Sequence, residues 1–237
     1  MRLIRNIELP FDQNELILHL GGQLGKEPSP RVQEATARML SLAMELAEPA
    51  GLFEVFPVLK REKRRMYLDE NTYFESALLV KFSGTAGSLA VCIYTLGKRL
   101  EDRADELMKQ GHLLDGALLD SIGTVLLSNT GLKVYDAIKE EAESLGVDAS
   151  VPASPGQIDW SLKQQKTVFD LLDAQQIGVT LTPSFLMIPK KSASVVVGLG
   201  HGVVKKGEGR SCDYCPLRDT CPSRKVSDYR LRKASQG

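Results

Sequence analysis

The chain has 237 residues, of which 43% are hydrophobic and 25% charged, and its 30 Lys and Arg residues balance its 30 Asp and Glu residues. These values are typical of a soluble globular protein, and the zero net charge excludes a global attraction to nucleic acid or membranes. No apolar run reaches the ~18 residues of a membrane-spanning helix and the N-terminus lacks the apolar stretch of a signal peptide, so a cytoplasmic protein with reduced thiols is expected.

The first hundred residues are predicted to mix strands and helices. Residues 1–10 alternate loosely and end at Pro10, which favours an edge strand. Ser29-Pro30 is a typical helix start, and the Pro and Gly of residues 49–51 end that helix. Residues 53–68 read as a hairpin, and residues 88–97 read as a buried strand in which Cys92 is a small buried hydrophobe.

The next stretch is strongly helical. Residues 97–111 form one amphipathic helix, and a second, longer helix runs on to about Ser144. Gly116, Gly123 and Gly131 lie along one stripe of this long helix. Because each glycine costs a helix up to about 1 kcal/mol, a closely packed partner is expected on that side.

The last part of the core is predicted to return to strands. After a turn-rich break at residues 151–157, Asp159 is expected to cap a helix that ends near Ala174. Three short extended runs follow within residues 177–200. Strands and helices without regular β-α-β alternation favour an α+β fold, with long helices packed on a twisted, mainly antiparallel sheet.

Residues 85–200 carry an ordered set of motifs that resembles the activation domain of vitamin-B12-dependent methionine synthase, and especially its stand-alone homologues. The set comprises "TLG" at the end of a strand, "LLDSIG" in a helix, "SPG" before "DW" and "LLDA", then "IGVTLTPSFLMIP" and "KSAS". The N-terminal part of the chain resembles this family only weakly.

The resemblance implies binding of S-adenosylmethionine (AdoMet) at Ser154, Pro155 and Gly156. It also implies a corrinoid-binding protein or methionine synthase as partner, which brings the cobalamin. In this family, inert Co(II) cobalamin is rescued by one-electron reduction and methylation. This chain departs from the family pattern where Pro152 replaces an arginine and Gln157 a tyrosine. An arginine can pair bidentately with the AdoMet carboxylate, and proline cannot.

Three of the four cysteines, Cys212, Cys215 and Cys221, fall within ten residues near the C-terminus. Short-spaced cysteines commonly hold iron–sulfur clusters, whereas structural zinc sites more often use two separate pairs. Corrinoid reactivation needs a low-potential electron donor, so a cluster, for example [4Fe–4S], is the favoured interpretation. A zinc site completed by His201 and free thiols are the alternatives.

We predict two parts: an activation-domain-like α+β domain at residues 1–204 and a basic, metal-binding tail at residues 205–237. The tail has nine Lys and Arg residues and four Asp and Glu residues. The tail is expected to extend beyond the core unless a metal organises it. The Lys and Arg side chains of the tail have two interpretations: a solvated surface, or a docking site for an acidic redox protein or for the corrinoid. They are Lys205, Lys206, Arg210, Arg218, Arg224 and Lys225.

The main functional hypothesis is therefore an accessory protein that reactivates a corrinoid protein, relaying an electron through an iron–sulfur cluster and presenting AdoMet. A non-enzymatic corrinoid-binding module with structural zinc is the alternative, and a basic zinc-knuckle protein for nucleic acid is disfavoured because aromatics are sparse in the basic stretch. His19 and His112 have no convincing catalytic partners in the sequence. Whether the chain is itself an enzyme stays open.

Overall fold

A computed structural model describes residues 1–234, which form one five-stranded sheet, two small sheets and seven α-helices. The helices are α1 (Gln13–His19), α2 (Pro30–Leu46), α3 (Ala77–Ser83), α4 (Arg99–Lys109), α5 (Leu113–Ser144), α6 (Gln165–Leu171) and α7 (Pro222–Ala234). The strands are β1 (Arg2–Ile4), β2 (Ala50–Pro57), β3 (Lys60–Arg61), β4 (Arg65–Tyr67), β5 (Tyr73–Glu75), β6 (Ser88–Thr95), β7 (Asp148–Ala149), β8 (Thr180–Leu181), β9 (Met187–Ile188) and β10 (Ser192–Gly200). Short 3-10 helices are η1 (Leu162–Gln164), η2 (Ala174–Ile177) and η3 (Ser211–Tyr214).

The main sheet has the strand order β1-β2-β6-β10-β7, and every neighbouring pair is antiparallel. Strand β6 is central, because residues 88–95 pair with residues 50–57 on one side and with residues 192–199 on the other. The predicted α+β class with a mainly antiparallel sheet is confirmed.

Both faces of the sheet are covered, which explains why β6 reads as a continuous apolar run. Cys92 lies on the face that packs against α5, in a core shared with Val134 and Val197. Val91 and Ile93 point to the opposite core, which α3 and α6 cover. Cys92 is completely buried, so its interpretation as a small core residue is confirmed.

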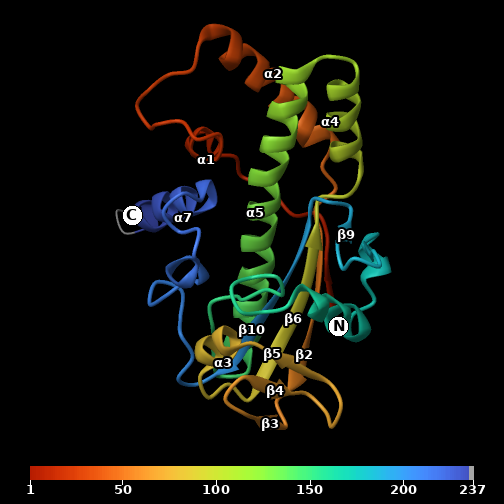
Figure 1. Cartoon of the computed structure of the whole chain (residues 1–237), viewed down its shortest axis with the longest axis vertical. Coiled ribbons are helices and arrows are strands. Elements are labelled where there is room, and N and C mark those ends of the chain that lie inside the picture. The colour runs from red at the N-terminus through yellow and green to blue at the C-terminus, as the bar shows by residue number, and fades with distance from the viewer. Residues whose placement is uncertain (235–237) are drawn as a thin grey trace.

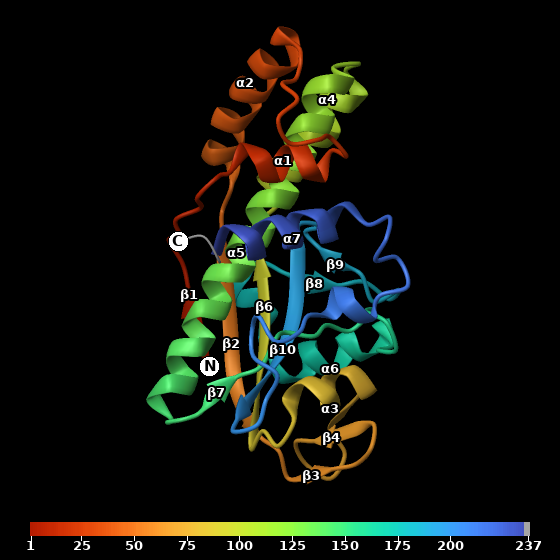
Figure 2. The ribbon, with the colours of Figure 1, turned by 90° about the vertical axis from the view of Figure 1, so that its left-hand side faces the viewer.

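Helix α5 extends beyond the sheet and carries a second packing region. Its N-terminal half packs with α2 and α4 in a separate apolar cluster that includes Met39, Leu100, Leu119 and Leu126. Figures 1 and 2 show α2 and α4 at one end of an elongated molecule and the β3–β4 hairpin at the other, with α5 running between them. Within residues 1–234, no helix combines the length and the apolar composition needed to cross a membrane.

The described part of the C-terminal segment does not extend beyond the core, contrary to the expectation for this tail. Helix α7 packs against α1, and Arg230 donates to both carboxylate oxygens of Glu15. This helix was missed in the sequence, although Pro222 at its first position is a typical start signal. The division of the chain into two domains at residue 204 stays a prediction.

Candidate functional site

The residues that lead into the predicted AdoMet turn lie along the β10 side of the main sheet. Val151 N–H donates to the carbonyl of Val204, and Ala153 forms an antiparallel bridge with Val196 of β10. The chain then turns outward, with Pro155 buried and Gly156 exposed. Gly156 has a φ of +92°, a conformation that favours glycine because other residues would be strained there. The turn therefore presents an exposed backbone to which a ligand could come close.

The two positions that depart from the family pattern differ in exposure. Gln157 is exposed at the tip of the turn, while Pro152 is half-buried. The carbonyl of Pro152 accepts a 3.3 Å hydrogen bond from the hydroxyl of Ser211. Residue 152 is therefore covered by the C-terminal segment and offers no cation to a carboxylate.

Asp159 and Trp160, the "DW" pair, have structural roles. The sequence predicts that Asp159 caps the helix that follows it, and this is wrong. Asp159 instead helps to cap α3: its carboxylate accepts from the Ala77 N–H at 2.7 Å and pairs with Arg64 at 2.9 Å. The helix predicted to start there instead begins as η1, after the cap residue Ser161. Trp160 packs edge-on against Phe74, with ring centroids 5.5 Å apart. The pair thus fixes the turn to the core beneath it.

The "KSAS" segment also binds inward. The Lys191 ammonium lies 2.8 Å from both the Asp120 carboxylate and the Thr124 hydroxyl on α5. Ser192 and Ser194 are buried, and Ser194 donates to the Gln165 side chain at 2.8 Å. The polar groups of this segment therefore join β10 to the helices.

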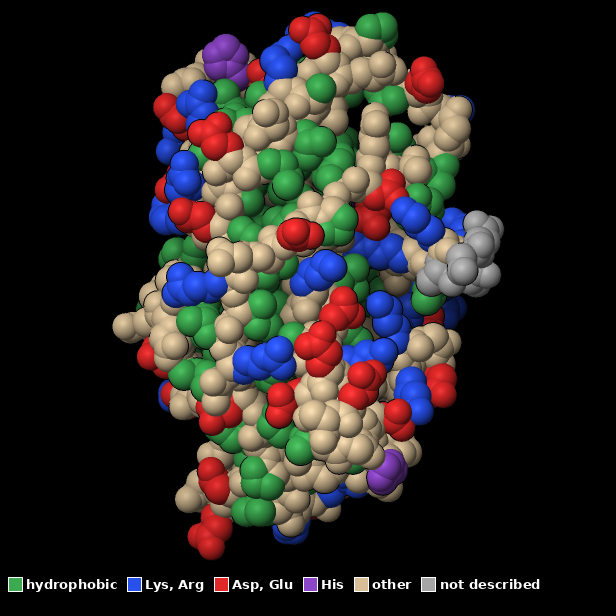
Figure 3. Space-filling view, turned by 180° about the vertical axis from the view of Figure 1, so that it is seen from behind, with side chains coloured by type: hydrophobic (Ala, Val, Ile, Leu, Met, Phe, Trp, Pro, Cys, Tyr) green, Lys and Arg blue, Asp and Glu red, His purple; other side chains and the backbone are tan. Residues whose placement is uncertain are grey.

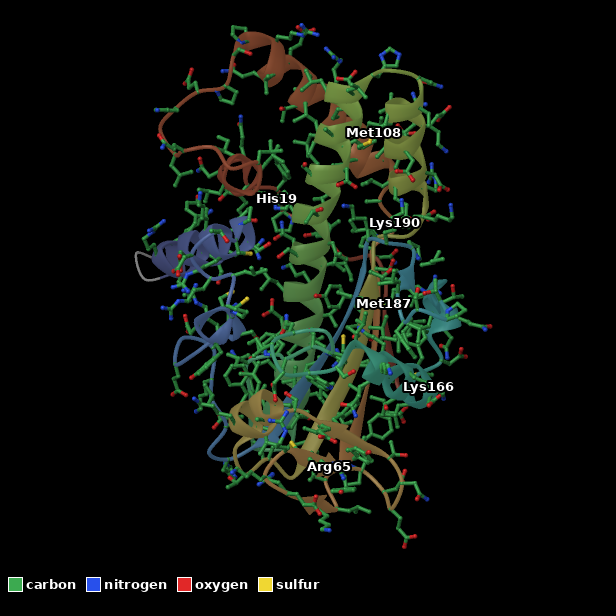
Figure 4. All side chains as sticks on the ribbon, in the orientation of Figure 1. His19, Arg65, Met108, Lys166, Met187 and Lys190 are labelled. Carbon is green, nitrogen blue, oxygen red and sulfur yellow. The ribbon has the colours of Figure 1, made fainter. Side chains whose placement is uncertain are left out.

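His19, whose role the sequence left open, ends α1 and faces α5, as Figure 4 shows. Burial lowers the pKa of His19, and the nearby Lys191 ammonium lowers it further, while Asp120 acts against both. A neutral imidazole is therefore favoured at neutral pH.

The three C-terminal cysteines are half-buried neighbours on and after η3. Burial raises the pKa of Cys212, and Cys221 and Cys215 add to the rise, whereas Arg210 and Arg224 oppose it. Cys215 and Cys221 thus lie near enough to Cys212 to influence its charge. Even so, residues 1–234 contain no group of three or more His, Cys, Asp or Glu side chains arranged to hold a metal ion. The geometry of this segment thus does not support the predicted metal site of Cys212, Cys215 and Cys221, with or without His201.

The cysteine segment and the predicted AdoMet turn lie side by side, although about 60 residues separate them in sequence. Besides the bond between Ser211 and Pro152, the Tyr214 ring packs edge-on against Phe82 of α3 at 5.8 Å and under the Lys81 ammonium at 4.2 Å. Figure 1 shows the segment descending from α7 toward α3. The sequence gives no signal for this proximity, because it arises only from the path of the chain after β10.

The basic residues of the tail are largely neutralised within the molecule. Arg210 bridges Asp213 and Asp228, and Lys205 pairs with Asp148 at 2.9 Å. Arg218 and Arg224 also have acidic neighbours. These pairs reduce the positive potential that the sequence composition indicates, so they weaken the interpretation of the tail as a docking site for acidic partners.

Comparison with known proteins supports the fold. No protein-family model and no curated protein sequence matches the chain. Among solved structures, the chain is similar to the MetH reactivation domain crystallised with bound AdoHcy, with a TM-score of 0.59 and 17% identity over 88% of this chain and 77% of that one. At this identity the likeness concerns the fold alone. The resemblance seen in the sequence is therefore confirmed in three dimensions: the chain has the fold of the MetH reactivation domain.

Proposed function

We propose that this protein assists the reactivation of a corrinoid protein and binds AdoMet or its product AdoHcy at the exposed turn formed by Ser154, Pro155 and Gly156. The observation that carries the proposal is the similarity of fold to a reactivation domain that was crystallised with AdoHcy. The turn retains the open glycine backbone that close approach of a ligand requires.

The residues fit this ligand in part. Glycine at position 156 leaves room for the ligand, because even an added Cβ would contact only Leu162 Cδ1, at 3.1 Å. Pro152 supplies no bidentate partner for the ligand carboxylate, and loss of such a charge-assisted bond costs about 1.5–3 kcal/mol. Binding at least tenfold weaker than in a site that keeps the arginine is therefore expected.

Calorimetric titration with AdoHcy and AdoMet tests the proposal. Gly156→Ala should strain the turn and weaken binding several-fold. Gly178→Ala is the matched control, since Gly178 also has a positive φ, of +69°, but ends η2 outside the turn. Absence of heat at millimolar ligand in the wild type, or equal weakening by both variants, would contradict the proposed site.

We further propose that Cys212, Cys215 and Cys221 hold an iron–sulfur cluster from which an electron reaches the corrinoid of a partner protein. The short spacing of the three cysteines supports this, as does the bond from Ser211 to Pro152, two residues before the turn. The described arrangement is not ready for a metal, so the cysteine segment would have to rearrange to bind one. A bound iron–sulfur cluster would supply a one-electron donor, whereas a bound zinc ion would only stabilise the fold of the segment.

Metal analysis distinguishes these possibilities. Protein purified without oxygen should contain iron and acid-labile sulfide, and Cys215→Ser should lose both. Stoichiometric zinc without iron would favour the non-enzymatic corrinoid-binding module, and the absence of both metals would refute a metal site. The matched control is Cys92→Ser, because Cys92 lies in the sheet core and should leave the metal content of the folded protein unchanged.

A further inference from the structure

We infer that the C-terminal segment of residues 210–234 acts as a hinged cover: α7 is a detachable ionic latch whose release uncovers the surface at Pro152. This inference concerns movement of the segment and does not depend on which ligand, if any, the turn binds.

Helix α7 is held mainly by polar contacts. Arg230 makes a two-pronged pair with Glu15 and also donates to Ser128 and Asn129 of α5. Among residues 222–233 of α7, the buried hydrophobic side chain is Val226. Salt screens the exposed pair of Lys233 with Asp12, and it screens the largely buried pair of Arg230 with Glu15 much less.

A second group of polar bonds holds the end of α7. The Asp12 carboxylate accepts from the hydroxyl of Tyr229 and from the ammonium of Lys233, both at 2.9 Å. Asp12 and Glu15 lie at the start of α1, so both groups of bonds attach α7 to the same short helix. Removal of a single carboxylate should therefore loosen the whole attachment.

The cysteine segment and α7 are tied to each other, so they should move together. Arg210 donates to Ser227 at 3.0 Å and pairs with Asp228, and both of these residues lie on α7. By contrast, the described contacts of η3 with the core are the weak Ser211 bond to Pro152 and the packing of Tyr214 on Phe82 and against the Lys81 ammonium. Residues 201–204 are held to the core, since Val203 is buried and the Val204 N–H donates to the Phe82 carbonyl. Residues 205–208 are exposed and belong to no helix or strand, as is common for hinges.

The cover has a clear location in the molecule. Figures 1 and 2 show α7 lying across α5, with the chain before it reaching α3 beside the predicted AdoMet turn. In the closed arrangement Ser211 covers Pro152, and opening would expose this residue without disturbing the sheet.

Hydrogen exchange measured by mass spectrometry on the full chain, as purified, tests the inference. Glu15→Gln removes one charge and keeps the side-chain shape. We expect exchange at least threefold faster in residues 222–234 and also in residues 211–221, with unchanged exchange in β6. The wild type should show the same pattern with a smaller acceleration when salt is raised from a low concentration to about 1 M, where the Debye length is about 3 Å.

The matched control is Lys166→Gln, which breaks a 2.6 Å exposed pair with Asp170 on α6, away from α7 (Figure 4). This variant should leave both C-terminal segments unchanged. Faster exchange in α7 alone would refute the coupling, and no change in either segment would refute the latch. Faster exchange throughout the molecule in Glu15→Gln would mean global destabilisation and would also contradict the inference, unless the wild-type salt series showed the local pattern.

Discussion

Three glycines on α5 allow neighbouring elements to pack closely, as their spacing predicts. A Cβ at Gly116 would lie 2.6 Å from Met108 Cγ and one at Gly123 would lie 2.6 Å from Leu100 Cδ2, both on α4. At Gly131 the contact is with the ring of Tyr94 on β6. The same stripe thus serves a helix at one end and the sheet at the other.

Gly123→Ala should destabilise the protein by about 1–2 kcal/mol. The added methyl overpacks a core in which Leu100 is completely buried, and the gain in helix propensity of about 1 kcal/mol offsets only part of that cost. Denaturant unfolding followed by circular dichroism measures the change. Gly87→Ala is the control, since its Cβ would meet no atom within 4 Å. A Gly123 variant as stable as this control would contradict the close packing.

Asp159 provides a second prediction for a single residue. Asp159→Ala removes the acceptor for the N–H groups of Ala77 and Leu78, while the N-cap Ser76 still accepts from Leu79, and should cost about 1–2 kcal/mol of unfolding free energy. Asp159→Asn keeps a side-chain oxygen and should cost clearly less. Equal losses in the two variants would show that the ion pair with Arg64, and not the cap, carries the stabilisation.

At the scale of elements, the attachment of α7 should depend on pH through Asp12. Burial alone would raise the pKa of Asp12, but hydrogen bonds from Lys233, Tyr229 and the Asn14 N–H together lower it below the ordinary 3.8. A carboxyl group whose pKa is lower in the folded state contributes stability that is complete above its unfolded pKa of about 3.9 and is lost as pH falls through the folded value.

Acidification below about pH 4 should therefore loosen α7, because it protonates Asp12. Hydrogen exchange in residues 222–234 as a function of pH, corrected for the intrinsic exchange rate, measures this. Asp12→Asn should show weak attachment already at neutral pH and a flatter pH dependence. If that variant kept the wild-type profile, another acid would have to hold the helix.

The elements themselves differ in how well the sequence predicts them. Helix α2 begins at Pro30, as the Ser-Pro start predicts, and β6 follows the apolar run because both its faces are buried. Helix α7 could not be recognised by an apolar stripe, since polar side chains fix it to α1 and α5. Local patterns report burial along one segment, whereas this attachment depends on acids some 215 residues away.

The candidate site was predictable in the same uneven way. The turn at Ser154–Gly156 was found from its motif, and the structure gives it an exposed glycine with positive φ. The contacts of Ser211 and Tyr214 near this turn could not be predicted, because they depend on the path of the loop after β10, and a loop has no periodic sequence pattern. Asp159 was recognised as a cap but assigned to the wrong helix, since helix caps are usually local and this one is not.

For the whole molecule, the arrangement of two packing regions along α5 predicts unequal local stability. Leu119 is completely buried in the cluster with α2 and α4, away from the sheet. Leu119→Ala should cost about 2–5 kcal/mol at this site. Hydrogen exchange should accelerate more in α2 and α4 than in β6 and β10. Uniform acceleration would show that the two regions unfold as one unit.

The surface charge fits a protein that does not attract partners by a field of one sign. Figure 3 shows Lys and Arg side chains interspersed with Asp and Glu on the back of the molecule, and the formal net charge is zero. Any encounter with a partner should then depend on local contacts and respond weakly to ionic strength.

The main sheet ends in very short strands, which bears on how the protein behaves at high concentration. At one margin β1 pairs through three residues, and at the other β7 pairs through only two. Each short strand covers only part of its longer neighbour, since β1 pairs with residues 51–53 of β2 and β7 with residues 199–200 of β10. Beyond β1, the outer edge of β2 carries the charged Glu54 and ends at Pro57, and a charge and a proline are two means by which natural proteins discourage sheets from joining edge to edge.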